Sequence, residues 1–357
     1  MIQDIAPHKF HNEYRKDARP EKDSPVLCFD GRKALVKRNE EKGPGEIELP
    51  LYEQVQKAVK DTVYAFAVDE TEYFLDISRS PVLLPGYEYI DIFTLRLTAD
   101  NVQGMILFTG FHLASWYKDS AYCGRCGNKN EHSDHERAMH CPECDRNIYP
   151  RIMPAVIVGV TDGERILLTQ YREGYGYNAL VAGFAEIGET LEETVAREVM
   201  EETGVPVKNI TYYKSQPWGI ANDLLVGYYC EADGDCEIHM DENELRLARW
   251  TERKDIVLQP DSYSLTNEMM KMFKEHGAFW KNSYRFFENR DCRYYPCHKG
   301  IDELNCMFCY CPMYSREDCL GEPKYKEVRG RIIKDCTDCT FPHRRENYDS
   351  IIKKLMQ

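Results

Sequence analysis

The chain has 357 residues, with 46 Lys and Arg side chains against 60 Asp and Glu side chains, which gives a net charge of −14. This length corresponds to two or three domains, and the acidic balance argues against a general nucleic-acid-binding or acidic-membrane-binding protein. Hydrophobic residues make up 43% and charged residues 30%, as in globular proteins rather than disordered chains. No apolar run approaches the roughly 18 residues of a membrane helix, and the polar N-terminus has no signal-peptide core. We therefore expect a cytoplasmic protein without a membrane partner.

Cysteine is unusually frequent, with 15 residues. An odd number of cysteines without a secretory signal indicates free thiols in a reducing compartment rather than a disulfide framework. Four of them lie between residues 123 and 144, and eight lie between residues 292 and 339. The remaining three, Cys28, Cys230 and Cys236, are expected to be ordinary thiols.

Residues 1–118 contain no recognisable catalytic motif, and we expect them to form a small α/β domain that serves as a scaffold or a dimer surface. Their β-branched and aromatic residues predict strands over 62–68 and 92–98. Asp100 is a suitable N-cap for a helix over 101–117. Within that helix four large apolar residues recur at helical spacing: Met105, Phe108, Phe111 and Trp116.

Residues 119–150 contain two short cysteine pairs in a polar stretch. Cys123 and Cys126 form one C-x2-C pair, and Cys141 and Cys144 form a second pair after fourteen residues. This spacing places four thiolates around one tetrahedral Zn²⁺, which leaves no open position and so indicates a structural zinc ribbon. Because the segment is too short to build a core, the metal is expected to supply much of its folding free energy. A redox pair and chance clustering are the alternatives.

A segment rich in strand and helix patterns follows over residues 151–280. Apolar runs predict strands over four ranges: 154–160, 165–171, 224–230 and 247–251. The first two are expected to form a hairpin through a turn at 161–163. Two helices are predicted, over 190–202 and 265–274. A capping box of Thr190 and Glu193 begins the first helix, and Gly204 ends it.

The first of these helices carries an acidic face. Glu198, Glu201 and Glu202 fall within about a 100° arc, and such close like charges repel one another by a few tenths of a kcal/mol per pair. Mg²⁺ or Mn²⁺, whose usual companion is a phosphate, would remove this penalty. Arg197 can pair with Glu189 and brace the preceding loop. The alternative is an ordinary solvated acidic surface.

Residues 183–205 match the pattern G-x5-E-x7-R-E-U-x-E-E-x-G-U at every fixed position, where U is a bulky aliphatic residue. The segment therefore resembles the Nudix box of the Nudix hydrolases. This resemblance implies an α/β/α sandwich and Mg²⁺-dependent cleavage of a diphosphate linked to another moiety. By this likeness the catalytic residues would be Glu189, Arg197, Glu198, Glu201 and Glu202. Glu198 and Glu202 would hold the metal, Glu201 would assist them, and Arg197 with Glu189 would give structural support.

Two further features narrow the resemblance: the four-cysteine ribbon directly before this domain, and the sequence Ser-Gln-Pro-Trp at 215–218. Over roughly residues 1–280 the chain resembles the NADH pyrophosphatase (NAD⁺ diphosphatase) family. The family implies hydrolysis of NADH or NAD⁺ to nicotinamide mononucleotide and AMP, a homodimer with sites built from both chains, and removal of NAD caps from RNA as a further activity. The implied Mg²⁺ or Mn²⁺ ligands are Ala182 (through its carbonyl), Glu198, Glu202 and Glu244. The implied substrate-binding residues are Tyr149, Gln216, Trp218 and Ile220.

The sequence departs from this family directly after Trp218. Where the family continues Pro-Phe-Pro-x-Ser, this chain has Gly219-Ile-Ala-Asn-Asp223. Ile220 therefore replaces the aromatic residue expected to stack on nicotinamide, and Asp223 is expected to add negative charge near the dinucleotide. Since stacking contributes roughly 0.5–1.5 kcal/mol, its loss would weaken nicotinamide preference up to about tenfold. The alternatives are another Nudix substrate, such as ADP-ribose or a dinucleoside polyphosphate, or a catalytically weak module that senses nucleotides and contacts nucleic acid.

Residues 281–357 differ in composition, with 15 basic against 12 acidic residues and eight cysteines, and are expected to form a separate metal-binding domain. They resemble a small cysteine-rich domain found alone or fused in prokaryotic proteins. The candidate metal ligands are Cys292, Cys297, His298, Cys306, Cys309, Cys311, Cys319, Cys336, Cys339 and His343. These residues suit two zinc sites, or one site with spare thiols, while the C-x2-C-x-C spacing at 306–311 also allows an iron–sulfur cluster. The pairing of ligands does not follow from the spacing.

Overall fold

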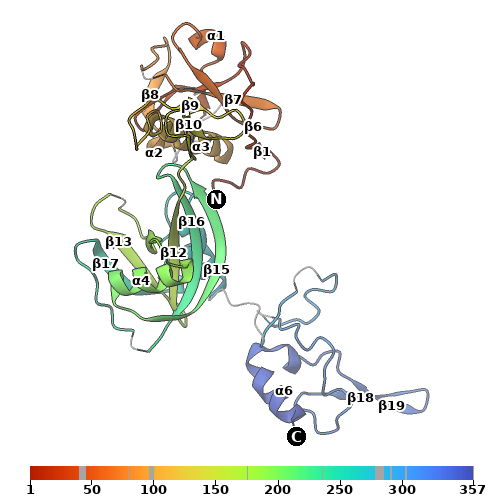
Figure 1. The fold of residues 1–357 in the computed structure, drawn as a ribbon. Coiled ribbons are helices and arrows are strands. Elements are labelled where there is room, and N and C mark those ends of the chain that lie inside the picture. The colour runs from red at the N-terminus through yellow and green to blue at the C-terminus, as the bar shows by residue number, and fades with distance from the viewer. Residues whose placement is uncertain are drawn as a thin grey trace. The chain divides into compact units, whose positions relative to one another are not determined.

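The computed structural model describes residues 1–39, 46–78, 80–95, 100–174, 176–234, 236–277, 285–289, 292–301 and 304–356. The chain forms two compact units, Met1–Gly277 and Ala278–Gln357 (Figure 1). The four domain boundaries expected from the sequence stay predictions. None of the described helices combines the length and the apolar character needed to cross a bilayer.

The N-terminal part of the first unit contains two small sheets and one long helix. The first sheet has the order β1-β6-β7-β2, with bounds Phe10–His11, Thr62–Val68, Thr71–Asp76 and Val26–Leu27. The second sheet contains β3 (Phe29–Asp30), β4 (Lys33–Arg38) and β5 (Ile47–Glu48), and β8 (Glu88–Asp91) also pairs with β4. A short helix α1 (Tyr52–Val55) and the long helix α3 (Asn101–Asp119) complete this part. The strand expected over 62–68 is confirmed.

The capping residue of α3 is confirmed, because the carboxylate of Asp100 accepts the N–H of Gln103 at 2.7 Å. The strand expected over 92–98 is wrong for its first half, where Ile92–Leu95 forms the helix α2; residues 96–99 lie outside the described part. Asp91 explains the difference, since its carboxylate accepts the N–H of Phe93 at 2.8 Å and so favours a helical turn. The spacing of three between Ile92 and Leu95 then buries both side chains in one core.

The ribbon segment forms a small antiparallel sheet in the order β11-β10-β9, with bounds Arg146–Ile148, Met139–Cys141 and Glu131–His132. Met139 and Ile148 pack into the hydrophobic core that surrounds α3. The ribbon is thus tied to the N-terminal part through apolar contacts as well as through its own cysteines.

The predicted Nudix domain is built on a six-stranded sheet in the order β15-β16-β12-β13-β17, with β14 paired to β12. Its strands are Val207–Trp218 (β15), Asp223–Ala232 (β16), Met153–Asp162 (β12), Arg165–Tyr171 (β13), Leu245–Glu252 (β17) and Val181–Phe184 (β14). Strands β12 and β16 run parallel, and the other pairs are antiparallel. All four strands expected in this domain are confirmed, as is the hairpin between β12 and β13.

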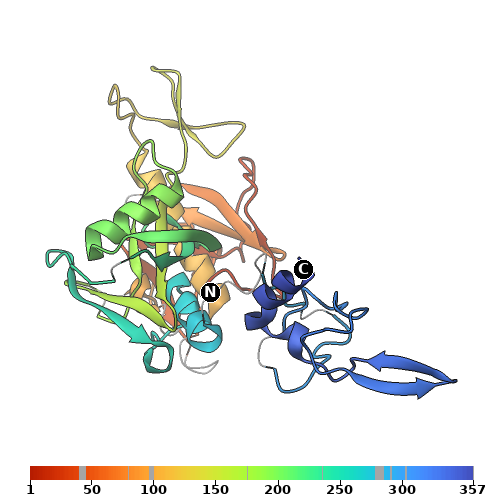
Figure 2. The same cartoon turned by 90° about the horizontal axis from the view of Figure 1, so that it is seen from below.

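One helix covers each face of this sheet, as Figure 2 shows with α4 in green and α5 in cyan. Val195 and Val199 of α4 (Leu191–Thr203) pack with Val156 and Val226 on one face. On the other face lies α5 (Leu265–His276), where the hydroxyl of Tyr229 donates to the carbonyl of Met269 at 2.6 Å. The expected α/β/α sandwich is therefore confirmed.

The C-terminal unit has little regular structure. A hairpin joins β18 (Lys324–Val328) to β19 (Arg331–Asp335), and one helix, α6 (Tyr348–Leu355), follows near the end. Its fully buried apolar side chains within the described residues are few: Phe286, Leu304, Met313 and Ile351. So small a core leaves the folding of this unit dependent on other crosslinks.

Candidate active site

Helix α4 begins and ends as its sequence predicts. The hydroxyl of Thr190 accepts the N–H of Glu193 at 3.2 Å, and the carboxylate of Glu193 accepts the N–H of Thr190 at 2.8 Å. Gly204 ends the helix with a left-handed φ of 69°, which glycine adopts without strain. With Val195 and Val199 turned into the core, the 3.6-residue period places Glu198 and Glu202 beside the sheet.

Glu202 is the most unusual carboxylate in this cluster. It is only 2% exposed, and its Oε2 is buried without a hydrogen-bond partner. The backbone N–H of Ala182 hydrogen-bonds to the same carboxylate. Because the N–H and C=O of one strand residue point to the same side, the carbonyl of Ala182 also faces the cluster. A buried acceptor without a donor beside further oxygen ligands is an arrangement that a hard divalent cation satisfies.

Three carboxylates share this region. Burial, together with the charges of Glu244 and Glu198, raises the pKa of Glu202 to about 8. Burial likewise raises the pKa of Glu198, with Glu201 and Glu244 adding to the shift and Arg197 opposing it. Glu244 lies in the turn before β17 and is itself exposed. The charges of Glu198, Glu202 and Glu244 therefore act on one another, although within the described residues only the ribbon cysteines bring three or more such ligand atoms within 4.8 Å of one another. Together with the carbonyl of Ala182, these carboxylates are the type of oxygen donor that Mg²⁺ or Mn²⁺ prefers.

Gly183 makes room for one of these carboxylates. A Cβ atom at this position would lie 1.9 Å from Cδ of Glu198. Gly183 pairs with Val156, whose side chain packs toward α4, so the glycine lies on the sheet face that α4 covers. The carboxylate of Glu198 therefore lies directly against the backbone of β14. Any residue larger than glycine at position 183 would displace it.

Arg197 organises the acidic loop before α4. Its Nε and Nη2 donate to the two carboxylate oxygens of Glu189 at 2.7 and 2.9 Å, and Nη2 also donates to the carbonyl of Phe184. This guanidinium lowers the pKa of Glu189 to about 2. The Nη1 atom donates to Glu198 at 2.7 Å and to Glu201 at 2.9 Å. The expected pairing of Arg197 with Glu189 is thus present, while Glu201 points outward with a 60% exposed side chain.

Tyr171 is a residue of the site that the sequence interpretation missed. Burial raises the pKa of its hydroxyl, and the charges of Glu202, Glu244 and Glu198 raise it further, so the ring borders the acidic cluster. The backbone N–H of the next residue, Arg172, donates to the carbonyl of Glu244 at 2.9 Å. The sequence could have indicated this position. Side chains alternate along β13, so Tyr171 lies on the same face as Leu167, which packs toward α4.

Gln216 lies on the other face of the sheet. It pairs with Leu225, which points away from the face on which Val226 meets α4. The side chain is fully buried: its amide donates to the carbonyl of Tyr263 at 2.6 Å, and its oxygen accepts the N–H of Leu265 at 2.6 Å. Within one chain the structure does not bring Gln216 to the carboxylates, and its role in substrate binding stays a prediction.

Trp218 and Ile220 pack against the N-terminal part. The Trp218 ring meets Phe108 of α3 edge-to-face with centroids 5.3 Å apart, and Ile220 joins the same core. Tyr149 lies at the end of the ribbon, 55% exposed, and its hydroxyl donates to Glu136 at 2.8 Å. For these three residues, too, substrate binding stays a prediction.

The altered loop after Trp218 has a structural explanation. A Cβ atom at Gly219 would lie 2.2 Å from the carbonyl oxygen of Phe108, so only glycine lets the loop approach α3 this closely. Asp223 is 7% exposed, burial raises its pKa to about 7, and its Oδ1 has no hydrogen-bond partner. Burial of this carboxyl thus disfavours the negative charge expected of Asp223, and its place near a dinucleotide stays a prediction.

The four ribbon cysteines form a compact metal site. The Sγ atoms of Cys123, Cys126, Cys141 and Cys144 all lie within 4.8 Å of one another. The N–H groups of Arg125 and Cys144 donate to the sulfurs of Cys123 and Cys141, each at 3.4 Å, and so stabilise negative charge on those sulfurs. This geometry fits a closed structural Zn²⁺ site.

Replacing Cys126 by Ser is expected to release the ribbon zinc, because three thiolates bind it less tightly and the ribbon has no core of its own. Metal analysis should show one zinc fewer per chain, and limited proteolysis should show new cleavage between residues 123 and 144. Cys236→Ser, outside the ribbon, is the matched control and should keep its zinc. An unchanged zinc content in Cys126→Ser would contradict the assignment.

Three family models match the chain: the NADH pyrophosphatase zinc ribbon domain over residues 118–149, the NUDIX domain over 151–273, and the cysteine-rich small domain over 283–357. A NAD-capped RNA hydrolase NudC from Klebsiella pneumoniae is 38% identical over 185 residues, which cover 51% of this chain and 71% of that protein. Its counterpart from Escherichia coli SMS-3-5 is 40% identical over 184 residues, with the same coverage. A crystal structure of a NUDIX hydrolase from Nitrosomonas europaea aligns at 20% identity with a TM-score of 0.38, covering 43% of this chain and 90% of that one.

Proposed function

The chain belongs to the NudC-type NADH pyrophosphatase family of the Nudix hydrolases, and we propose that it hydrolyses the pyrophosphate bond of NADH or NAD⁺. The products are AMP and the reduced or oxidised nicotinamide mononucleotide. The observation that carries the proposal is the buried Oε2 of Glu202, which lacks a hydrogen-bond donor in a carboxyl group whose pKa the charges of Glu244 and Glu198 raise. A purely structural helix gains nothing from this arrangement, whereas a metal-dependent hydrolase needs it.

The residues that would hold Mg²⁺ or Mn²⁺ are Glu198, Glu202, Glu244 and the carbonyl of Ala182. A cation bound there would supply positive charge for the pyrophosphate oxygens and would make a bound water molecule more acidic. The chain's own contribution is orientation. Arg197 fixes Glu198 through the 2.7 Å contact of its Nη1 atom, and the buried hydroxyl of Tyr171 lies within electrostatic reach of all three carboxylates.

The affinity for Mg²⁺ is expected to rise as the pH rises from 6 toward 8. Without metal, the folded state holds the proton of Glu202 to a pKa of about 8 against an ordinary 4.5, so this contribution to stability is lost as the pH rises through that range. Mg²⁺ must displace this proton. The dissociation constant of Mg²⁺ should therefore fall up to about tenfold for each unit by which the pH rises toward 8. Calorimetric titration at pH 6, 7 and 8 measures the effect. Glu202→Gln should flatten the profile, and a pH-independent constant for the unaltered protein would contradict the coupling.

The same bond occurs in the NAD cap of RNA, and we extend the proposal to NAD-capped RNA because the relatives carry that activity in their names. Ile220 and Trp218 pack against α3, and recognition of nicotinamide by these two residues is a prediction. Other diphosphates are therefore the competing substrates. None of the 15 cysteines, all of which lie within the described residues, forms a disulfide, and a reducing, cytoplasmic location is part of the proposal.

A homodimer is part of the proposal, because the expected substrate residues Gln216, Trp218 and Ile220 do not face the carboxylates of their own chain. Light scattering coupled to gel filtration should give about twice the 41.7 kDa of one chain. A single-chain mass at micromolar concentration would contradict the dimer.

Product mass spectrometry tests the function. Purified protein with Mg²⁺ or Mn²⁺ is given NADH, NAD⁺, ADP-ribose, a diadenosine polyphosphate and NAD-capped RNA in parallel, and divalent cations are omitted as a control. We expect AMP and reduced nicotinamide mononucleotide from NADH, and 5′-monophosphate RNA from the capped substrate. Faster cleavage of ADP-ribose or the diadenosine compound would overturn the substrate assignment, and no turnover of any substrate would overturn the enzymatic function.

A further inference from the structure

We propose that the C-terminal unit binds two zinc ions, each held by four cysteines in a separate set. The first set is Cys292, Cys297, Cys306 and Cys309. The second set is Cys311, Cys319, Cys336 and Cys339. The sequence does not determine which cysteines share an ion. The contacts in the folded chain indicate the two sets.

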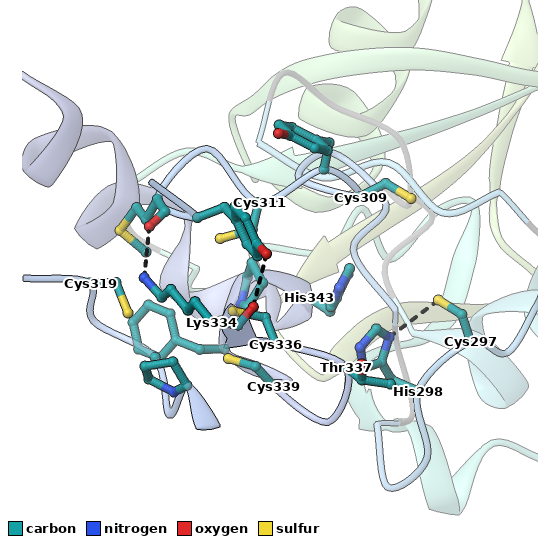
Figure 3. Close-up of a pocket in the computed structure, with 17 residues that line it drawn as sticks. Cys297, His298, Cys309, Cys311, Cys319, Lys334, Cys336, Thr337, Cys339 and His343 are labelled. Atoms are coloured by element: carbon teal, nitrogen blue, oxygen red, sulfur yellow. Dashed lines mark hydrogen bonds between the residues drawn. The ribbon is translucent and has the colours of Figure 1, made fainter. Parts of the chain in front are cut away.

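The first set is organised around Cys306. The N–H of Cys309 donates to the carbonyl of Cys306 at 3.1 Å, which closes the turn of a C-x2-C pair. The N–H of Asn289 donates to Sγ of Cys306 at 3.4 Å, and Asn289 in turn accepts the N–H of Cys292 at 3.4 Å. Asn289 therefore links Cys292 to Cys306, and Cys297 joins this set because it lies with Cys309 on one side of the cavity described below (Figure 3).

The second set is organised around the end of β19. The N–H of Cys339 donates to the carbonyl of Cys336 at 3.1 Å, which forms the second C-x2-C turn. Lys334 ties the segment between Cys311 and Cys319 to this turn, because its ammonium donates to the carbonyls of Met313 and Arg316 at 3.2 and 2.6 Å.

Close backbone contact supports the second set independently. A Cβ atom at Gly321 would lie 2.6 Å from Sγ of Cys339, so the chain just after Cys319 passes directly over that sulfur. The hydroxyl of Tyr314 donates to the carbonyl of Lys334 at 2.8 Å, and the N–H of Tyr314 donates to the carbonyl of Cys311. Cys311 is thus held toward β19 and not toward its sequence neighbour Cys309.

Six of the eight cysteines line one cavity of about 390 Å³, in which Cys311, Cys319, Cys336 and Cys339 gather on one side and Cys297 and Cys309 lie on the other (Figure 3). Within the described residues, the ribbon is the place where three or more such ligand atoms lie within 4.8 Å of one another. The C-terminal sulfurs must therefore close in on the ions. A unit with one hairpin and a small core allows this movement, and the binding free energy drives it.

This partition excludes an iron–sulfur cluster on the C-x2-C-x-C segment, because it assigns Cys309 and Cys311 to different sites. It also leaves the two histidines outside both ligand sets. His343 is buried, its Nδ1 lies 3.0 Å from the carbonyl oxygen of Asn305, and its ring packs on His298 with centroids 4.2 Å apart. Four thiolates saturate a tetrahedral zinc ion, so the histidine pair remains part of the packing between the sites.

The charge of the unit suits two such sites. A zinc ion with four thiolates carries two negative charges, so two sites carry four. The unit has 15 basic against 12 acidic residues, and its surplus of positive charge offsets most of this. Lys334 places one of these charges at the second set, where it hydrogen-bonds Cys319.

Native mass spectrometry of the full-length chain tests the pairing through double substitutions. The unaltered protein should carry three zinc ions, one in the ribbon and two in the C-terminal unit. Cys306→Ser with Cys309→Ser should remove one ion, whereas Cys309→Ser with Cys311→Ser should remove two. Cys236→Ser is the matched control and should keep all three. Loss of a single ion from the Cys309 and Cys311 pair, or iron in the unaltered protein, would overturn the proposal.

Diffraction from crystals of the unaltered full-length protein at the zinc absorption edge provides a second measurement, which is independent of whether the variants fold. We expect two anomalous peaks in the C-terminal unit, each surrounded by one of the two sets at about 2.3 Å. A single peak, a histidine nitrogen among the ligands, or any other grouping of cysteines would overturn the proposal.

Discussion

Glu202→Gln is expected to lower kcat for NADH about a thousandfold, because the amide cannot replace the charge that holds the metal, and a catalytic cation contributes several kcal/mol of transition-state stabilisation. The fold should survive. The carboxyl of Glu202 is buried and its pKa is raised to about 8, so the substitution removes a charge that folding disfavours. In metal-free buffer near pH 8, the variant should unfold at the same temperature as the unaltered protein or a higher one.

Glu192→Gln is the matched control, since it neutralises another carboxylate of α4 that is exposed and lies in the first turn. It should retain nearly full activity. The readouts are steady-state rates with NADH and thermal unfolding with and without Mg²⁺. A Glu202→Gln protein with more than one tenth of the original kcat, and with Mg²⁺ still raising its unfolding temperature, would contradict the assignment of Glu202 as a metal ligand.

Gly183→Ala is expected to lower kcat about a hundredfold, the cost of misplacing a catalytic group by about 1 Å. The new Cβ atom would lie 1.9 Å from Cδ of Glu198, so that carboxylate must leave its place on β14. The contact of Arg197 with Glu198 would move with it. Because Gly183 carries no charge and makes no side-chain contact, the loss would report on the position of Glu198 and on its contact with Arg197.

Gly176→Ala in the same domain is the control, because its nearest neighbour would be the Arg246 guanidinium at 3.8 Å, an ordinary contact. Activity and circular dichroism of both variants provide the comparison. If Gly183→Ala folded normally and kept its kcat, Glu198 would not need its observed position, and its expected role as a metal ligand would be contradicted.

Local patterns predicted much of this site. The capping box of Thr190 and Glu193, the stop at Gly204 and the pairing of Arg197 with Glu189 depend on residues within one helix and its adjoining loop, so their spacing determines their geometry. The ribbon cysteines are likewise fixed by two short turns and one metal. The role of Glu244 as a metal ligand was predicted only from the family resemblance. No residue near it in the sequence indicates that it lies close to α4.

The remaining features depend on contacts between distant segments. Gln216 faces α5 rather than α4 because of the register between β15 and β16, and one residue of slip would reverse it. Tyr171 borders the acidic cluster only because β13 lies where α4 and the turn at Glu244 meet. The strand expected over 92–98 failed because the side chain of Asp91 competes locally for the backbone.

The contact between Gly219 and α3 constrains how this protein can change over evolutionary time. A larger residue at 219 would collide with the carbonyl of Phe108, and no side-chain change in α3 alone can relieve a clash with its backbone. Variation in the loop 219–223 should therefore be accepted only together with shifts in α3 and in the partners of Trp218. Homologous chains that have the prolines and the aromatic residue in this loop are expected to differ in α3 as well. Substrate specificity and the packing of the N-terminal part should therefore change together.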